Sequence, residues 1–168
     1  CSAGSTAGRD AAGIGSDSLS SIEKVIAGNY DDTIRGDLQA NGFTGGLGSD
    51  CLYGGRDRVQ DMFSYNATAE SRPGAARDKI FDFVSKIDRI VLSAIDANTA
   101  AAQTGDQAFA FSGKIAKANS VWFKIADVDG NKATSDIVVC GDVDGNTTAD
   151  FEIGLVGVTS VVAADIAL

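Results

Sequence analysis

Residues 27–53 read AGNYDDTIR GDLQANGFT GGLGSDCLY, which is three nine-residue units laid end to end. Each unit has small or polar residues in its first half, an acidic or amide residue at its sixth position and an apolar residue at its eighth. The sixth positions are Asp32, Asn41 and Asp50, and the eighth positions are Ile34, Phe43 and Leu52. Self-similarity at a short fixed period is typical of solenoid architectures, so this stretch predicts the fold.

The third unit fits the pattern G-G-x-G-x-D-x-U-x, which is typical of a calcium-binding parallel β-roll, at every fixed place. Six residues form a tight turn, whose glycines permit positive φ and let backbone carbonyls converge on an ion. The other three form a short strand with one apolar side chain pointing inward. Because each full coil takes two units, Asp32 and Asp50 are expected to stack on one side and to face one calcium ion. The candidate ligands at this site are Asn29, Asp31, Asp32, Gly46, Gly48 and Asp50.

The second unit and a fourth one, residues 54–65 (GGRDRVQDMFSY), depart from the pattern. The second unit has Asp37, Gln39 and Asn41 in place of Gly, Gly and Asp. In the fourth unit Asp57 and Asp61 lie on either side of the expected ligand position, which Val59 occupies. A site that pairs Asn41 with Asp57 or Asp61 is the weaker prediction, because each lost carboxylate lowers calcium affinity.

Further stretches agree in their order along the chain: SIEKVIAGNYDDTI (21–34), DKIFDFVSKIDRIVLSAIDAN (78–98), GDQAFAF (105–111) and GDVDGNTTADFEI (141–153). Together with the repeats they resemble the repeats-in-toxin (RTX) proteins, in particular the C-terminal calcium-binding region of serralysin-type proteases. The resemblance implies an all-β fold with calcium as its ligand. It also implies that Asp78 and Asp82, in the segment D-x-I-x-D-F, help to close the last calcium site. Capping of turns at strand ends is the alternative for both residues.

The chain divides into three parts. Residues 1–18 are small and polar without a period and predict a flexible N-terminal arm; residues 19–65 predict the roll, and residues 66–168 a β-rich C-terminal cap. Strands are expected at 108–111, 121–126, 135–139 and 151–156, separated by glycine turns. Short strands with hairpin turns predict a β-sandwich-like cap that covers the open end of the roll. A short helix is expected over 95–103, since ANTAAAQ favours one.

A second motif, in residues 142–150, has the spacing D-x-D-G-N-x-x-x-D. Carboxylates at its first, third and ninth positions, with an amide and a carbonyl between them, are how a compact loop surrounds calcium. A metal-free hairpin turn explains the DG and GN pairs equally well. The candidate ligands are Asp142, Asp144, Asn146, Thr148 and Asp150. The pentapeptide DVDGN also occurs at 127–131, where Asp136 lies one place too far along and a hairpin turn is the better interpretation.

Composition limits the function. The 168 residues include 20 Asp but only 3 Glu, and the net charge is −9, which argues against a nucleic-acid partner. Short Asp side chains in Gly- and Asn-rich turns suit calcium. Histidine is absent, which excludes an H-E-x-x-H zinc site and histidine-based triads. No stretch approaches the roughly 18 consecutive apolar residues of a membrane helix.

The three cysteines, Cys1, Cys51 and Cys140, lack any zinc spacing. Cys51 and Cys140 are interpreted as small buried apolar residues, and the sequence gives no argument for a disulfide between them. Cys1, followed by Ser and a small-residue tether, is what a lipid-anchored mature lipoprotein looks like. A fragment that happens to begin there is the favoured alternative.

These observations predict a secreted, extracellular or cell-surface calcium-binding module that folds when it meets extracellular calcium and serves secretion, stabilisation or docking. An acidic residue followed by apolar ones, as at the end of this chain, is common in substrates of type I secretion. One alternative is a structural or accessory subunit of a surface layer, an adhesin or a membrane complex, with a protein partner. The other is a C-terminal fragment of a secreted protease; without histidine or a G-x-S-x-G motif, we expect no catalysis by this chain.

Overall fold

The computed structural model describes residues 22–100, 104–132 and 135–168. The expected N-terminal arm and the features proposed for Cys1 lie outside these residues, so those expectations stay predictions. The described part is all-β, with three single 3₁₀ turns at Thr68–Glu70, Gly74–Ala76 and Ala163–Asp165 and no α-helix among the described residues. None of these helical segments could cross a membrane.

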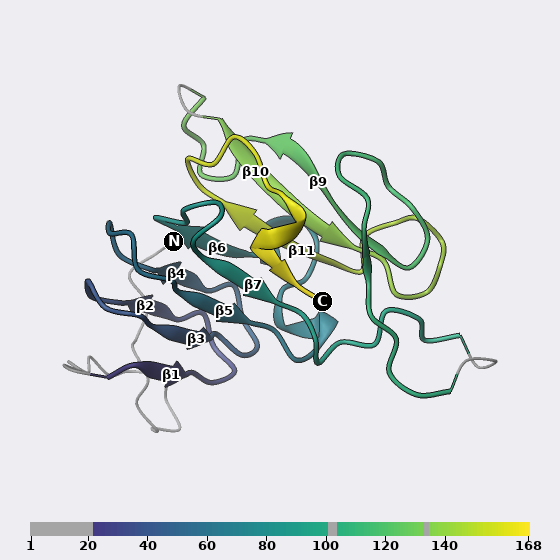
Figure 1. Ribbon diagram of the computed structural model, residues 1–168, viewed down its shortest axis with the longest axis horizontal. Coiled ribbons are helices and arrows are strands. Elements are labelled where there is room, and N and C mark those ends of the chain that lie inside the picture. The colour runs from purple at the N-terminus through teal and green to yellow at the C-terminus, as the bar shows by residue number, and fades with distance from the viewer. Residues whose placement is uncertain (1–21, 101–103, 133–134) are drawn as a thin grey trace.

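The repeats form a two-sheet parallel roll, as the nine-residue period predicts (Figure 1). Successive units alternate between the sheets, so strands of one sheet are two units apart. Val25 lies opposite Phe43 in one sheet, and Ile34 lies opposite Leu52 in the other. The first sheet contains β1 (Lys24–Ile26), β3 (Gly42–Thr44), β5 (Met62–Ser64), β7 (Arg89–Val91) and β12 (Ile166–Ala167), all parallel.

The second sheet begins in the roll and continues into the C-terminal part of the chain. Its seven strands, in spatial order, are β2 (Thr33–Arg35), β4 (Cys51–Tyr53), β6 (Asp78–Phe81), β11 (Phe151–Leu155), β10 (Asp136–Gly141), β9 (Ser120–Ala126) and β8 (Ala110–Phe111). β11 pairs in parallel with β6 and antiparallel with β10. The expected strand-rich cap is present. Its strands continue the second sheet of the roll beyond residue 65, the predicted boundary between roll and cap.

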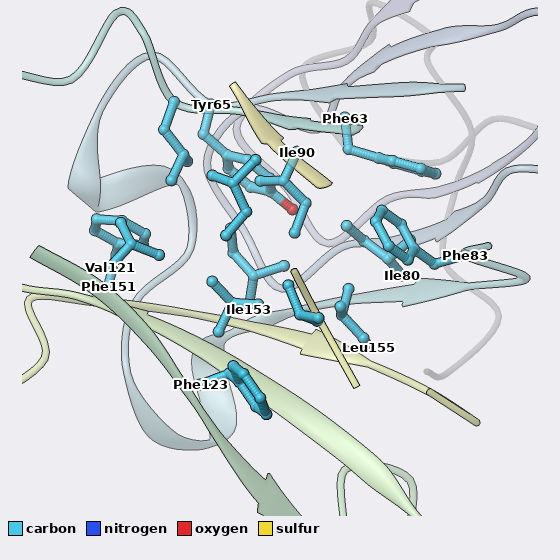
Figure 2. Packing of buried hydrophobic residues seen from close by; sticks show 14 of the residues in the cluster. Phe63, Tyr65, Ile80, Phe83, Ile90, Val121, Phe123, Phe151, Ile153 and Leu155 are labelled. Carbon is cyan, nitrogen blue, oxygen red and sulfur yellow. The ribbon is translucent and has the colours of Figure 1, made fainter. Parts of the chain in front are cut away.

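One interior serves both parts of the chain. The inward side chains of the roll form two columns, and the C-terminal strands lengthen both, because Leu155 lies opposite Ile80 and Ile166 lies opposite Ile90. Figure 2 shows side chains from the roll and from β9 and β11 filling the same space. Burial of this shared apolar surface is the main stabilising term for roll and cap together.

The helix expected over 95–103 does not form in its described part, residues 95–100. The Asp96 carboxylate accepts hydrogen bonds from the amides of Asn98 (3.0 Å) and Gln107 (3.1 Å), and Asn98 Oδ1 accepts one from Ala100 N (3.1 Å). Such side-chain bonds compete with the helical hydrogen-bond pattern. The helix prediction was therefore wrong here, although alanine favours helices.

Candidate metal centre

Three aspartates line up on one side of the roll, each at the start of a strand of the second sheet. Asp32 N donates to Asp50 Oδ1 and Asp50 N donates to Asp78 Oδ1, both at 2.8 Å. Asp78 N donates in turn to Ser71 Oγ at 2.9 Å. We call Asp32, Asp50 and Asp78 the first carboxylate column. The expected stacking of Asp32 on Asp50 is thus present in the structure, and Asp78 extends it.

The first column contains buried carboxylate oxygen atoms that lack a hydrogen-bond partner in the described part of the chain. Asp50 and Asp78 are 0% exposed, and the Oδ2 atoms of both have no hydrogen-bond partner among the described residues. Burial raises the pKa of Asp50 to about 7 and that of Asp78 to about 8, with the charge of Asp50 adding to the effect on Asp78. Buried carboxylates without partners are costly, so this place requires a cation or a proton.

The turns beside this column approach each other closely, which only glycine permits. Gly46 has φ +86° and Gly48 has φ +142°. A methyl group on Gly48 would lie 2.5 Å from Tyr30 O, and one on Gly46 would collide with Gly28 O. The stacked turns thus bring the backbone carbonyls of Gly28 and Tyr30 close to the glycines of the next coil, and carbonyl and carboxylate oxygens are the ligands that calcium takes.

Two other predicted ligands belong to the same turns. Asp31 Oδ1 accepts a hydrogen bond from Ser49 N at 2.8 Å, which ties one turn to the next. Asn29 is exposed at the edge of its turn. The structure therefore gives Asp31 a turn-linking contact and gives Asn29 no described contact with the column.

A second carboxylate column, formed by Asn41, Asp61 and Asp88, lies at the starts of strands of the first sheet. Asn41 N donates to Asp61 Oδ1 (2.9 Å), and Asp61 N donates to Asp88 Oδ1 (3.0 Å). Burial raises the pKa of Asp61 to about 7, and it also raises the pKa of Asp88. The structure thus brings Asn41 and Asp61 together, although Asn41 offers an amide where the first column has a carboxylate.

The irregular fourth unit explains how Asp61 reaches this column. Phe63 lies opposite Phe43, which is 20 residues earlier, whereas regular units put 18 residues between such partners. The two extra residues fall in the turn that contains Asp57 and Val59, so Asp61 and not Val59 precedes the strand. Asp57 Oδ2 is buried without a hydrogen-bond partner among the described residues, and the charge of Asp57 raises the pKa of Asp61 further.

Asp88 is a site residue that sequence reasoning missed, while Asp82 was predicted and lies elsewhere. Asp82 Oδ1 binds Arg56 Nε at 3.0 Å, and Asp82 has φ +63° in the turn after β6, outside both columns. The signal for Asp88 was present in the sequence. It precedes Ile90 by two positions, just as Asp50 precedes Leu52 and Asp61 precedes Phe63.

The loop 142–150 gathers three of its predicted ligands. One carboxylate oxygen from each of Asp142, Asp144 and Asp150 lies within 4.8 Å of the others. Amides already occupy Asp142: Gly145 N donates to its Oδ1 (2.9 Å) and Thr147 N to its Oδ2 (2.8 Å). Burial raises the pKa of Asp142, but these backbone hydrogen bonds outweigh it and the pKa is lowered overall.

The remaining ligands predicted in this loop make only local bonds. Asn146 Nδ2 donates to Asp144 Oδ2 (2.8 Å), and Thr148 N donates to Asn146 Oδ1 (2.6 Å). The related loop 127–136 also gathers three carboxylates, those of Asp127, Asp129 and Asp136. Asp136 was judged too far along the sequence, but its Oδ2 accepts from Val128 N at 2.8 Å. In the described part of both loops, carboxylates accept hydrogen bonds from backbone amides of the same loop.

A buried ionic cluster around Glu152 links strands of the second sheet and has a structural role. Glu152, 5% exposed, accepts hydrogen bonds from Lys124 Nζ (2.6 Å) and Gly74 N (3.0 Å) and pairs with Arg77 (3.1 Å). It ties the segment before β6 to β9 and β11. Cys140 lies nearby as a buried free thiol, so it does not pair with Cys51. Burial raises the pKa of Cys140 to about 12, which makes the thiol unreactive.

The two-sheet parallel roll, with three aspartates stacked along one side and Asn41, Asp61 and Asp88 stacked along the other, defines an RTX-type β-roll protein. The sequence matches the family described as peptidase M10 serralysin C terminal over residues 12–168, and the chain belongs to that family. This match confirms the resemblance seen in the sequence. A search of the curated proteins finds no match.

Among solved structures, the fold resembles the solution structure of the AlgE6R3 subunit from the mannuronan C5-epimerase of Azotobacter vinelandii. The two sequences are 21% identical, the alignment covers 90% of this chain and 86% of that chain, and the TM-score is 0.44.

Proposed function

We propose that this chain is a secreted calcium-binding module whose roll folds around calcium outside the cell, and that it carries no catalytic activity of its own. The single observation that carries the proposal is that the buried Oδ2 atoms of Asp50 and Asp78 have no hydrogen-bond partner in the part of the chain that the structure describes. A buried carboxylate is stable only when it is paired, hydrogen-bonded or bound to a metal. These residues fit calcium, which binds to carboxylate and carbonyl oxygen atoms at such turns.

The first column would hold the ion best. Asp32, Asp50 and Asp78 supply carboxylates, and the turns at 27–32 and 45–50 supply carbonyls. Bound calcium would neutralise side chains that otherwise repel one another in the interior. Because the columns exist only when the coils are stacked, the free energy of binding becomes free energy of folding. The second column would bind more weakly, since Asn41 replaces one carboxylate.

A calcium-dependent fold suits export. A chain with unoccupied columns would stay open where calcium is scarce and fold where it is abundant, as extracellular modules with dissociation constants of about 10⁻⁴–10⁻³ M do. Membership in the serralysin C-terminal family supports secretion, stabilisation or docking as the biological use. The loops at 127–136 and 142–150 are weaker candidates for calcium, because no described carboxylate oxygen in them is both buried and without a hydrogen-bond partner, unlike Oδ2 of Asp50 and of Asp78.

Isothermal titration of the metal-free chain with calcium tests the proposal. We expect saturable binding that disappears when magnesium replaces calcium, because magnesium demands a near-ideal octahedral shell and gives up water reluctantly. Absence of calcium binding up to several millimolar would overturn the proposed function.

A further inference from the structure

The C-terminal segment, residues 162–168, is built into the roll. Its strand β12 is the outermost strand of the first sheet, where Ile166 lies opposite Ile90 and Ala167 lies opposite Val91. Leu92 N donates to Ala167 O at 2.8 Å. Ile166 is 5% exposed, and Leu168 packs against the main core. The end of the chain is therefore a part of the sheet that holds the second column.

Asp165 fastens this segment to the turn that follows β6. Asp165 is 0% exposed, and its carboxylate accepts hydrogen bonds from Ser85 Oγ (2.7 Å), Lys86 N (2.6 Å) and Val162 N (2.9 Å). Two of these donors belong to residues 84–88, the β6–β7 turn. Lys86 adopts φ +71°, a conformation that a non-glycine residue keeps only where its surroundings hold it.

The second column also contacts the β6–β7 turn, through Asp88. Asp88 Oδ2 accepts from Val84 N at 2.7 Å, and Asp88 N donates to Val84 O at 2.9 Å. Asp88 Oδ1 accepts from Asp61 N at 3.0 Å. A continuous set of carboxylate-to-amide hydrogen bonds thus runs from Asn41 through Asp61 and Asp88 to the β6–β7 turn, and Asp165 binds that turn.

Asp88 and Asp165 place two carboxylates against the same short turn. Val84 N donates to Asp88 Oδ2, while the next two residues, Ser85 and Lys86, donate to Asp165. Two carboxylates on one turn repel each other. A cation bound at Asp88 would remove that repulsion and would favour the conformation in which Asp165 is buried.

We propose that residues 162–168 are a C-terminal latch whose closure is coupled to cation binding in the second carboxylate column, with Asp165 as the positioning residue. The proposal rests on the proposed function, because it requires calcium in the roll. Asp61 and Asp88 would hold the calcium ion; Asp88, hydrogen-bonded to Val84, would then fix the β6–β7 turn, to which Asp165 binds through Ser85 and Lys86. The coupling is reciprocal, so a seated latch tightens calcium binding in the second column.

The experiment is hydrogen–deuterium exchange of the full chain, read by mass spectrometry on the peptide 162–168, with strand β10 (136–141) as the internal reference. Wild-type protein is compared with Asp61→Asn and Asp50→Asn. These two form a matched pair, since both aspartates are buried and both occupy the middle of a column. Each is measured at a calcium concentration that saturates its circular dichroism signal, and calcium uptake is titrated on the same samples.

The latch predicts that Asp61→Asn speeds exchange in 162–168 by about fivefold or more, the lower end of typical coupling between sites. Asp50→Asn should leave this exchange within twofold of wild type, and neither variant should change the reference strand. Equal acceleration by both variants would overturn the latch, because it would report general loosening. The latch would also be overturned if the wild-type protein bound calcium but its residues 162–168 were not protected from hydrogen–deuterium exchange. Failure of the proposed function looks different: the wild type would take up no calcium.

Ser85→Ala keeps the proposal testable if Asp61→Asn does not fold. It removes one of the three hydrogen bonds to Asp165 and touches neither column directly. We expect exchange in 162–168 to rise about fivefold, the effect of one lost hydrogen bond, and the calcium midpoint of the second column to rise with it. Faster exchange with an unchanged calcium midpoint would show that the latch and the column are independent, and would overturn the coupling.

Discussion

Asp50 shows how a single side chain links folding to ion binding. Its Oδ1 accepts the Asp32 amide and so fixes the stacking of two coils, while its Oδ2 is buried with no partner among the described residues. Oδ1 therefore helps to hold the coils of the roll together, whereas Oδ2 requires a cation or a proton for the roll to be stable. In a solvated turn, water would bind an unpaired carboxylate oxygen and its free-energy cost would be small. In the interior, the same unpaired oxygen opposes folding.

Asp50→Ala should therefore weaken calcium binding far more than Asp129→Ala. Asp129 is exposed in the loop 127–136, and its Oδ1 accepts a hydrogen bond from the Asn131 amide. We expect at least a tenfold loss of affinity for the first variant, since even an outer-shell partner of a metal ligand is worth about that much, and no measurable loss for the second. Equal losses in a calcium titration would contradict the assignment of the first column.

The close approach of the stacked turns gives a second prediction at the residue scale. Gly48→Ala should destabilise the calcium-loaded protein by about 1–3 kcal/mol, because φ is +142° there and the new methyl group would lie 2.5 Å from Tyr30 O. Gly28→Ala is the matched control in the neighbouring turn. Its φ is not in the positive range, and its methyl group would meet no atom within 4 Å. Urea unfolding at saturating calcium measures both, and equal midpoints would contradict the packing described here.

At the scale of elements, the nine-residue period predicts the roll correctly, but only where the period is kept. Asp32 and Asp50 could be paired from the sequence because they lie 18 residues apart. The corresponding separations are 28 residues for Asp50 and Asp78, 20 for Asn41 and Asp61 and 27 for Asp61 and Asp88. The inserted residues sit in turns and leave the strand pairing intact, so counting along the sequence left Asp57 and Asp61 as alternative partners of Asn41 and missed Asp88.

The strands beyond the roll could be located from their pattern, but their pairing could not. Nothing in FEIGL indicates that β11 adds in parallel to β6 while it pairs antiparallel with β10. The same limit applies to Asp136, because only the hairpin between β9 and β10 brings it to Asp127 and Asp129. Parallel pairing between distant segments is decided by the packing of the whole interior, which a local pattern does not contain.

The shared sheet predicts that the roll and the cap unfold together. Leu155→Ala should lower the free energy of unfolding by about 2–5 kcal/mol, because this fully buried side chain on β11 extends the apolar column of the roll beyond Ile80. Ile125→Ala, at a 61% exposed position on β9, is the control and should change it by less than about 0.5 kcal/mol. Two separate unfolding transitions in the calcium-loaded wild type would argue against a common interior.

At the scale of the whole molecule, the buried carboxylates set how stability depends on pH. In the metal-free protein, burial raises the pKa values of Asp50 and Asp61 to about 7 and that of Asp78 to about 8, from an ordinary 3.8. The folded state therefore binds more protons than the unfolded state between these limits. The resulting stabilisation is fully present below about pH 4 and is lost as the pH rises through 7 to 8.

Metal-free protein should accordingly be more stable at pH 5 than at pH 8, because protons take the place of calcium in the columns. Glu152 and Asp142 oppose this trend only below about pH 4.5, since their pKa values are lowered and their contribution is lost in that more acidic range. The folded fraction of exhaustively dialysed protein, read by far-ultraviolet circular dichroism at the two pH values, measures the difference. A larger folded fraction at pH 8 would show that these carboxylates are not buried as the structure has them.

The central claim is that calcium folds the roll, and far-ultraviolet circular dichroism tests it most directly. The purified chain is measured at pH 7.5 in excess chelator and then in millimolar calcium. The account predicts a spectrum dominated by unordered chain in chelator that becomes a β spectrum when calcium is added, with the transition shifted to higher calcium in Asp50→Ala. An identical β spectrum and an identical melting temperature in both conditions would contradict it.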